Sequence, residues 1–144
     1  MKYILLALLF LTGCAFPRLT SNYAPQTVAH EKALVYIYRT KTTIDAANLD
    51  IPRFFVNEKQ VGKLAIGGYY AEEVTPGDVD VAYDVGLFGI PISWPRYHVK
   101  FKAEPGQKYF VKFSIESMMR ITEFKQVPQA QGEEEIKSTA LLVN

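Results

Sequence analysis

Side chains of the types that commonly perform catalysis are scarce in this chain. Cys14 is the only cysteine, and His30 and His98 are the only histidines. No serine or carboxylate stands at a spacing from either histidine that suggests a catalytic triad, although triads also assemble from residues distant in sequence. The sequence therefore favours a protein that is not an enzyme, with a hydrolase built around His98 as the alternative.

Three carboxylates, Asp78, Asp80 and Asp84, stand close together along the chain. Hard cations such as Ca²⁺ prefer several oxygen ligands from such a group. However, Ala82 interrupts the ligand spacing and no loop glycine lies among the three. We interpret the aspartates as the solvent-facing side of a β-strand whose valines and Tyr83 point inward, and we expect no metal site.

Basic side chains are expected on the outward faces of two later strands. His98, Lys100 and Lys102 belong to the first strand, and Lys108 and Lys112 to the second. If the two strands are neighbours, these residues make one basic patch that would contact anionic lipid head groups or an acidic partner. The alternative is a row of solvated lysines that protects a sheet edge.

Residues 86–95 carry apolar side chains between glycines and prolines, which exclude a regular strand or helix through the segment. Such a loop either closes one end of the domain as a structural lid or is exposed to a partner. We favour the lid. If the loop is exposed, the expected interface anchors are Phe88, Ile90 and Trp94, the last being the only tryptophan.

The segment that precedes Cys14 has the three parts of a secretory signal, namely Lys2, an apolar core at 3–11 and small residues before the cysteine. It is too short to span a bilayer, which takes about 20 apolar residues. The run Leu11-Thr12-Gly13-Cys14 resembles the lipobox of bacterial lipoproteins. The resemblance implies a diacylglycerol on the Cys14 sulfur, removal of residues 1–13, and acylation of the new amino terminus, with palmitate as an expected chain. The alternative is an ordinary cleaved signal peptide with a chance cysteine.

Ala15 follows the cysteine, at the position where an Asp favours retention in the inner membrane of well-studied lipoproteins. By the same resemblance, the protein is expected at the outer membrane. Removal of residues 1–13 from the 144-residue chain leaves 131 residues, enough for one domain with its own core. With Cys14 lipidated, no thiol remains for a disulfide, a metal site or nucleophilic catalysis.

The mature chain is electrically balanced. Of the 16 basic side chains Lys2 lies in the removed segment, so 15 basic and 15 acidic side chains remain. Nucleic acid is not expected as a partner, because phosphate binding needs a basic excess on some face.

From residue 33 onward, apolar and polar residues alternate and Tyr, Phe, Val and Ile are frequent, a pattern typical of β-strands. Pro76-Gly77 and Pro105-Gly106 predict tight turns in which glycine takes a positive φ. The expected fold is all-β, an antiparallel β-sandwich of seven to eight strands of the immunoglobulin or PEGA-like kind. The expected strands cover 33–39, 53–57, 60–65, 69–74, 78–85, 97–103, 109–116 and 120–127.

The remaining segments flank this domain. Residues 14–32 are rich in Pro, Ser, Thr and Asn and are expected to form a lipidated tether. Residues 128–144 form a C-terminal segment, in which we expect a short helix over about 132–142 with Ile136, Ala140 and Val143 as its apolar stripe.

Alternation also assigns the inward faces of two strands. In 97–103 the expected inward residues are Tyr97, Val99, Phe101 and Ala103, and in 109–116 they are Tyr109, Val111, Phe113 and Ile115. A two-residue turn at Pro105-Gly106 would pair Phe101 with Phe110, which has the wrong parity for these sets. We therefore expect a wider loop, a bulge or a crossing between two sheets at this turn.

Several motifs occur in a recognisable order: Ala33-Leu34-Val35-Tyr36-Ile37-Tyr38-Arg39, Phe55-Val56-Asn57 with Val61-Gly62-Lys63-Leu64, Gly68-Tyr69, Pro76-Gly77, and Pro105-Gly106-Gln107-Lys108-Tyr109-Phe110. This series resembles the DUF2846 family of bacterial lipoproteins, whose function is uncharacterised, over residues 33–127. The central part also resembles a PEGA-type sandwich module, with Glu58 standing where Gly or Asp is common in the turn. No catalytic residue is implied by a family that has none assigned.

Together these observations predict a small all-β lipoprotein on the periplasmic side of a Gram-negative envelope, with a role in binding or assembly. Its expected partners are the lipid bilayer, through the anchor, and an envelope protein that the sequence does not name. The covalent lipid on Cys14 takes the place of a cofactor. Tethering would raise the effective concentration of the domain for its neighbours, and an envelope hydrolase with a site around His98 is the alternative.

Overall fold

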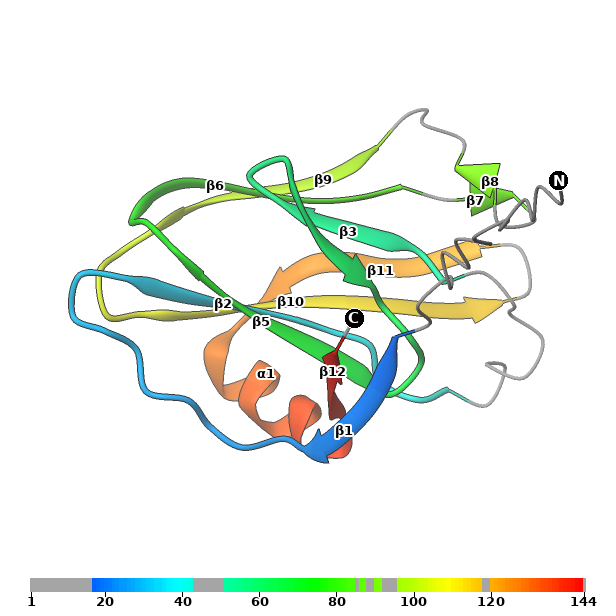
Figure 1. Ribbon diagram of the computed structural model, residues 1–144, viewed down its shortest axis with the longest axis horizontal. Helices are drawn as coiled ribbons and strands as arrows, with labels where there is room; N and C mark the ends of the chain where they lie inside the picture. The colour runs from blue at the N-terminus through cyan, green and yellow to red at the C-terminus, as the bar shows by residue number, and fades with distance from the viewer. Residues whose placement is uncertain are drawn as a thin grey trace, which may run out of the picture.

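The computed structural model describes residues 17–42, 51–84, 86–87, 90–91, 96–117 and 120–143. Within these ranges the chain is mostly β, with two main sheets and one short α-helix (Figure 1). The first sheet has six strands, in the order β1 (Arg18–Asn22), β12 (Ala140–Val143), β5 (Gly68–Val74), β2 (Ala33–Tyr38), β10 (Lys108–Ser117) and β11 (Arg120–Val127). The second sheet has four strands, in the order β4 (Lys59–Lys63), β3 (Arg53–Val56), β6 (Gly77–Asp84) and β9 (Tyr97–Ala103).

Smaller elements complete the described part of the chain. β7 (Gly86–Leu87) and β8 (Ile90–Pro91) pair only with each other there. Helix α1 (Gln129–Glu135) continues into the 3-10 helix η2 (Ile136–Ser138). All eight expected strands are present, and β1 and β12 bring the two main sheets to ten strands rather than seven or eight.

The six-stranded sheet is mixed, which corrects the expectation of a wholly antiparallel arrangement. β10 runs parallel to β2, and β12 runs parallel to β5. Parallel neighbours require a long crossover connection. Here the chain passes through the four-stranded sheet between the members of each parallel pair, and these excursions serve as the crossovers.

The two sheets enclose one apolar core, to which each contributes alternate residues. The rings of Phe54, Tyr83 and Phe113 meet there at centroid distances of 5.0 to 5.5 Å. The six-stranded sheet contributes Val35, Ile37, Tyr70, Val111 and Phe113, and the four-stranded sheet contributes Phe54, Val56, Val79, Val81 and Tyr83. The inward parity expected for Val79, Val81 and Tyr83 is confirmed.

Arg39 immediately follows β2 and is fully buried. Its backbone N–H donates to the Gly68 carbonyl at 3.0 Å, and its guanidinium carbon lies 5.7 Å from the centroid of the Phe113 ring. A cation held over an aromatic face in an apolar setting is stabilised by the ring quadrupole. This arginine therefore joins β2, β5 and β10.

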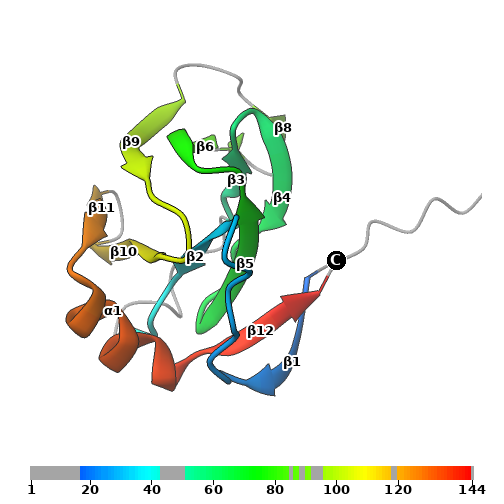
Figure 2. The ribbon, with the colours of Figure 1, turned by 90° about the vertical axis from the view of Figure 1, so that its left-hand side faces the viewer.

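The outer face of the six-stranded sheet is covered by a second apolar cluster. Helix α1 and the 3-10 helix η2 lie against this face, below the sheet in Figure 2. Tyr23, which follows β1, packs edge-on against the rings of Tyr36 and Tyr69 at 5.7 and 5.6 Å. Because both of its faces are covered, β2 is buried along its whole length, as expected for a central strand. The cluster comprises Leu34, Tyr36, Tyr38, Tyr69, Phe110, Val127 and Ile136.

The expected tether at 14–32 is largely part of the domain. β1 pairs with β12, the N–H of Tyr23 donates to the carbonyl of Thr139 at 3.1 Å, and the N–H of Gln26 donates to the hydroxyl of Tyr36 at 3.2 Å. The partners of β1 and Tyr23 lie more than a hundred residues away in the chain, so no local pattern indicates them. Gln26 instead binds Tyr36, a member of the second cluster. Residues 1–16, including Cys14, lie outside the described residues.

The C-terminal segment differs from the expected helix at both of its ends. Helix α1 begins at Gln129 and ends at Glu135, and the stretch Ala140–Val143 is a strand. Ile136 is fully buried, as its place in the expected stripe required. Val143 is half-exposed instead, because the apolar C-terminal run pairs with β1 and β5 rather than continuing the helix.

The turn between β9 and β10 carries the chain from one sheet to the other, which is one of the three arrangements expected there. Gly106 takes φ +74° there, as the turn requires. Val111 and Phe113 are buried as expected, but Tyr97, which was expected to face inward, is 50% exposed. Tyr97 lies at the start of an edge strand. One face of its ring stacks on Tyr83 at a centroid distance of 5.0 Å, and much of the rest of the side chain is exposed.

Candidate functional site

The outward face of the four-stranded sheet carries exposed charged side chains on β6 and β9, although Phe55, Ala82 and Asp84 on the same face are buried. α1, η2, β1 and β12 all lie on the opposite side of the molecule (Figure 2). The antiparallel register sets the outward side chains of β3, β6 and β9 in rows across this face. Residues far apart in sequence therefore meet on it.

Strand β6 supplies acids to this face and β9 supplies bases. Asp78 and Asp80 alternate with valines that point into the core, which confirms their expected outward position. On β9, every second residue from His98 onward is basic, namely His98, Lys100 and Lys102. The register places Asp78 opposite Lys102 and Asp80 opposite Lys100. We call these five residues the charged face.

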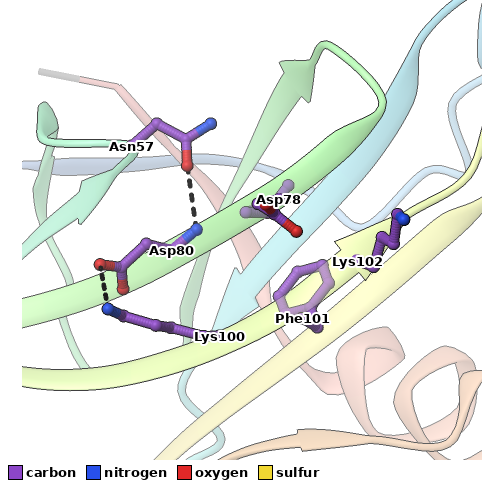
Figure 3. A pocket seen from close by; sticks show the side chains of 7 residues that line it. Asn57, Asp78, Asp80, Lys100, Phe101 and Lys102 are labelled. Atoms are coloured by element: carbon purple, nitrogen blue, oxygen red, sulfur yellow. Dashed lines mark hydrogen bonds and ion pairs between the residues drawn. The ribbon is translucent and has the colours of Figure 1, made fainter.

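Asp80 makes more hydrogen bonds and ion pairs than the other residues of the charged face. Its carboxylate oxygens lie 2.9 and 3.0 Å from Nδ1 of His98, and one of them lies 3.8 Å from Nζ of Lys100. Its backbone N–H donates to Oδ1 of Asn57 at 2.9 Å (Figure 3). The N–H of Asn57 donates to the carbonyl of Asp80, also at 2.9 Å. The β3–β4 turn therefore positions Asp80, and Asp80 in turn orients His98.

The geometry of that turn follows from its sequence. Asn57 and Glu58 have φ values of 47° and 67°, the pair of positive angles that a type I′ hairpin turn requires. Asn tolerates this conformation well, and Glu58 adopts it although Gly is more usual at its position. The turn type, which the unusual Glu58 left open, is thereby assigned.

A shallow pocket of about 520 Å³ opens over the junction of β6 and β9. Its lining consists of Asn57, Asp78, Val79, Asp80, Lys100, Phe101 and Lys102 (Figure 3). Asp78 and Lys102 are exposed, and no ion pair joins either of them to another side chain of the described residues. The pocket therefore presents the carboxylate of Asp78 and the ammonium of Lys102 to solvent. These two groups suit a polar ligand that carries one positive and one negative charge.

The contact between His98 and Asp80 has the form of a catalytic base and its orienting group. A carboxylate on one ring nitrogen fixes the imidazole and leaves the other nitrogen to act on a reactant. However, no hydroxyl or thiol of the described residues is hydrogen-bonded to His98, and His98 does not line the pocket. The described arrangement thus contains a base without a nucleophile.

Asp84 does not share the solvent-facing position expected for it. It is 2% exposed and accepts hydrogen bonds from Nε and Nη2 of Arg53 at 3.0 and 2.7 Å. The register places Arg53 opposite Asp84, and the guanidinium fork matches the carboxylate in a bidentate pair. Among the residues described, no three His, Cys, Asp or Glu side chains gather into a potential metal site.

The expected basic patch does not form one surface, because its two strands belong to different sheets. Lys100 and Lys102 lie on β9, whereas Lys108 and Lys112 lie on β10. The side chain of Lys112 is only 15% exposed, and its ammonium is engaged by two glutamates. The exposed cations of β9 therefore act with the acids of β6 rather than with the lysines of β10.

The cluster around Lys112 ties helix α1 to the six-stranded sheet. Nζ of Lys112 lies 3.0 Å from Glu123 and 3.1 Å from Glu135, and the hydroxyl of Tyr38 donates to Glu135 at 2.6 Å. Burial opposes the charge of Glu135, but hydrogen bonds from Tyr38 and Lys112 outweigh it and lower its pKa. Hydrogen bonds from Lys125 and Lys112 lower the pKa of Glu123, and, against burial, the two glutamates raise the pKa of Lys112. With its charges satisfied internally, this cluster is structural.

Other candidates from the sequence cannot be placed. Cys14, Phe88 and Trp94 lie outside the described residues. Ile90 belongs to strand β8, whose pairing with β7 is described without its side chains.

Sequence reasoning missed Asn57 as a site residue and the contact between Asp80 and His98. The available signal was the charge of the two strands, since β6 alternates acids and β9 alternates bases. Opposite charges stabilise directly opposed positions of neighbouring strands. That rule favours β6 and β9 as neighbours in the register now observed.

A mostly β domain of two sheets with an exposed charged face defines the class of protein only broadly. A match to a known family defines it more narrowly: the chain belongs to the family described as protein of unknown function (DUF2846), which matches residues 29–125. The match includes every residue of the charged face and confirms the family resemblance seen in the sequence. No curated protein matches the chain. Within the described ranges, no helix has the length and apolar character needed to cross a membrane.

Proposed function

We propose that this chain is a lipid-anchored protein of a Gram-negative cell envelope that binds a partner protein through its charged face. The anchor is a diacylglycerol on Cys14, with residues 1–13 removed and the domain on the periplasmic side of the outer membrane. The lipobox-like run at 11–14 supports the anchor, and the first strand begins only four residues after Cys14. We further propose that the two sheets form a sandwich of the immunoglobulin or PEGA-like kind, since they share one core.

The observation that carries the binding role is the uncommitted pair Asp78 and Lys102. The two residues are opposed across β6 and β9, both are exposed, and they stand beside Asp80, whose carboxylate is already engaged. A partner segment that presents a basic and an acidic side chain would pair with both. Such complementarity gives orientation and partner choice more than raw affinity.

The lipid would strengthen this weak contact by confinement. Fixing the domain to a membrane raises its effective concentration for partners on the same surface, which increases occupancy without any new contact. A shallow pocket of modest size is therefore sufficient for recruitment.

Replacement of the cysteine tests the anchor. Cys14→Ser should release the protein from the membrane fraction, whereas Thr20→Ser, a matched change on exposed β1, should leave it there. The mature mass of the wild type should show loss of residues 1–13 and gain of acyl chains. Retention of Cys14→Ser in the membrane, or a mature mass without acyl groups, would contradict the anchor.

Charge reversal tests the binding face. Asp78→Lys and Lys102→Glu should each reduce recovery of the copurifying partner from crosslinked cells at least tenfold. The exchange Asp78→Lys with Lys102→Asp keeps net charge constant and should also lose the partner, because the order of the charges is reversed. Lys137→Glu, at an exposed position on the far side of the molecule, serves as the control. Undiminished recovery with all the charged-face variants would refute this binding surface.

The loop at 86–95 is tested in the same assay with Trp94→Ala. Loss of the partner at an unchanged melting temperature would assign the loop to the interface, with Phe88 and Ile90 as further anchors. A fall in melting temperature with the partner retained would assign it the role of a structural lid.

The second candidate function is an envelope hydrolase with a site around His98, and the contact with Asp80 favours it. The purified lipidated protein would then turn over ester, amide or glycoside probes. That turnover should disappear in both His98→Gln and Asp80→Asn. Turnover that survives both substitutions, or none in the wild type, would exclude this site.

A further inference from the structure

We propose that the end of the β1–β12 pair, which carries Arg18, Leu19 and Val143, is the surface of the domain that contacts the lipid head groups of the anchoring membrane. This inference rests on the proposed lipid at Cys14. It adds the orientation of the domain and a second interaction surface.

The first observation is the exposure of apolar side chains at this end. Leu19 is 47% exposed and Val143 is 48% exposed, and with Tyr97 they are the large apolar side chains most exposed in the described part of the chain. The register pairs Arg18 with Val143 and Leu19 with Leu142, so Leu19 and Val143 stand at the same end of the strand pair with their side chains on opposite faces of it. Single exposed apolar residues are common. Two on opposite faces of one strand end would both leave water if that end entered the interfacial layer of a membrane.

The second observation is that β1 is an edge strand without a protective cover. Every residue of β1 is exposed, and β12 is its one strand neighbour among the described elements. Beyond Leu19 the strand is polar, with Thr20, Ser21 and Asn22. The apolar character is therefore confined to the end at which the chain arrives from Cys14.

Chain length connects this end to the bilayer. Four residue steps separate Cys14 from Arg18, and an extended chain advances at most about 3.6 Å per step, which limits the separation to about 14 Å. The head-group layer on each side of a bilayer is about 5 to 8 Å thick. With the lipid at its cysteine, the start of β1 can rise only slightly above that layer.

The chemistry of the tip fits this location. Arg18 is exposed, and a cation next to an anionic membrane surface is attracted to phosphate groups. Half-exposed Leu19 and Val143 lose water contact when they enter the interface between head groups and acyl chains. Side chains of both kinds therefore favour the same position.

The orientation has a consequence for the charged face. In Figure 2 the tip of the β1–β12 pair, beside the C label, lies on the right of the molecule, and β9 lies at the upper left. With the tip on the membrane, the charged face on β9 therefore lies on a distant part of the domain. A periplasmic partner then reaches Asp78 and Lys102 without obstruction by lipid.

Depth-dependent fluorescence quenching tests this surface in the full lipidated chain. The probe vesicles contain phosphatidylethanolamine and phosphatidylglycerol with a quencher attached to the head group. Trp94→Phe removes the only tryptophan, and single tryptophans are then introduced as Leu19→Trp, Val143→Trp or, as the control on the charged side, Tyr97→Trp. Quenching at positions 19 and 143 should exceed that at position 97 at least threefold.

Two measurements distinguish a failure of the proposed lipid anchor from a failure of the proposed membrane-contact surface. A purified chain whose mass shows no acyl groups would overturn the anchor and this surface together. A chain that carries the lipid but is quenched equally at all three positions would overturn the surface alone. Hydrogen exchange on the wild-type chain avoids the tryptophan changes: β1 amides should be protected more strongly on vesicles than in detergent. Protection that appears in detergent with rising protein concentration would instead assign the edge to a second copy of the chain.

Discussion

Replacing Gly132 by alanine sets two physical effects against each other in helix α1. Alanine is favoured over glycine inside a helix by about 1 kcal/mol, because glycine loses more backbone freedom on folding. At this position, however, an added Cβ would lie 2.3 Å from Cγ and 2.4 Å from Cβ of Phe110. Carbon atoms in contact normally stay about 3.5 to 4.0 Å apart. The overlap therefore opposes the gain in propensity.

The overlap cannot be relieved by a rotamer change. The Cβ of Phe110 is fixed by the backbone of β10, and its ring is fully buried and stacked on Tyr36 at 5.0 Å. Helix α1 must instead move away from the sheet. Overpacking of this kind costs about 1 to 3 kcal/mol, and a contact this short belongs at the upper end. After subtraction of the propensity gain, Gly132→Ala should lower the free energy of unfolding by about 2 kcal/mol.

Urea unfolding and thermal unfolding of the mature chain, both followed by circular dichroism, measure this effect. A loss of that size corresponds to a fall in melting temperature of about 6 to 8 °C for a domain of this length. Ala130→Gly is the matched control, since Ala130 is an exposed position of the same helix and should lose only about 1 kcal/mol of propensity. An unchanged or raised melting temperature for Gly132→Ala would refute the close packing of α1 on Phe110.

Three further predictions concern stability. Arg53→Ala removes the bidentate partner of the Asp84 side chain, which is 3% exposed. The variant should lose about 2 to 3 kcal/mol of unfolding free energy in urea titrations, and an unchanged free energy of unfolding would contradict the ion pair. The pKa of Glu135 is lowered in the fold, so its contribution is present above the ordinary value of 4.5 and lost as the pH falls through the lowered value. Melting temperatures from pH 7 to pH 3 should therefore fall less in Glu135→Gln than in the wild type, which keeps its contact with Lys112 only while the carboxylate is ionised. Gly106→Ala meets no atom within 4 Å but holds φ +74°, so strain alone should cost about 1 to 2 kcal/mol, and a stabilised variant would contradict the turn.

The sequence was sufficient to predict the strands whose signal is local. Alternation and the Pro-Gly turns located all eight expected strands, because period-two patterns and positive-φ glycines are properties of short segments. β1 and β12 carry no such signal, and each is held mainly by pairing with the other across more than a hundred residues. Gly132 made the C-terminal helix difficult to predict, although the structure shows that its missing side chain is what allows the helix to pack on Phe110.

The candidate site shows the same difference between what local patterns predict and what depends on non-local pairing. Alternation placed Asp78, Asp80 and Lys102 on outward faces, but their meeting depends on the register between β6 and β9, which is non-local. The basic patch failed for a related reason. The patch required the strands at 97–103 and 109–116 to be neighbours, whereas the chain crosses between them to the other sheet. The mismatch in parity at the Pro105-Gly106 turn was the local sign of the crossing.

The central claim, that an anchored domain binds a partner through its charged face, is tested most directly by photo-crosslinking in intact cells. A photoreactive amino acid is placed at Lys100 on the charged face, which leaves Asp78 and Lys102 intact, or at Lys137 on the opposite side of the molecule, both in the lipidated chain. The account predicts a discrete protein adduct from position 100 that is lost when Asp78→Lys is added, and none from position 137. Adducts from position 137 alone, or from neither position, would contradict it.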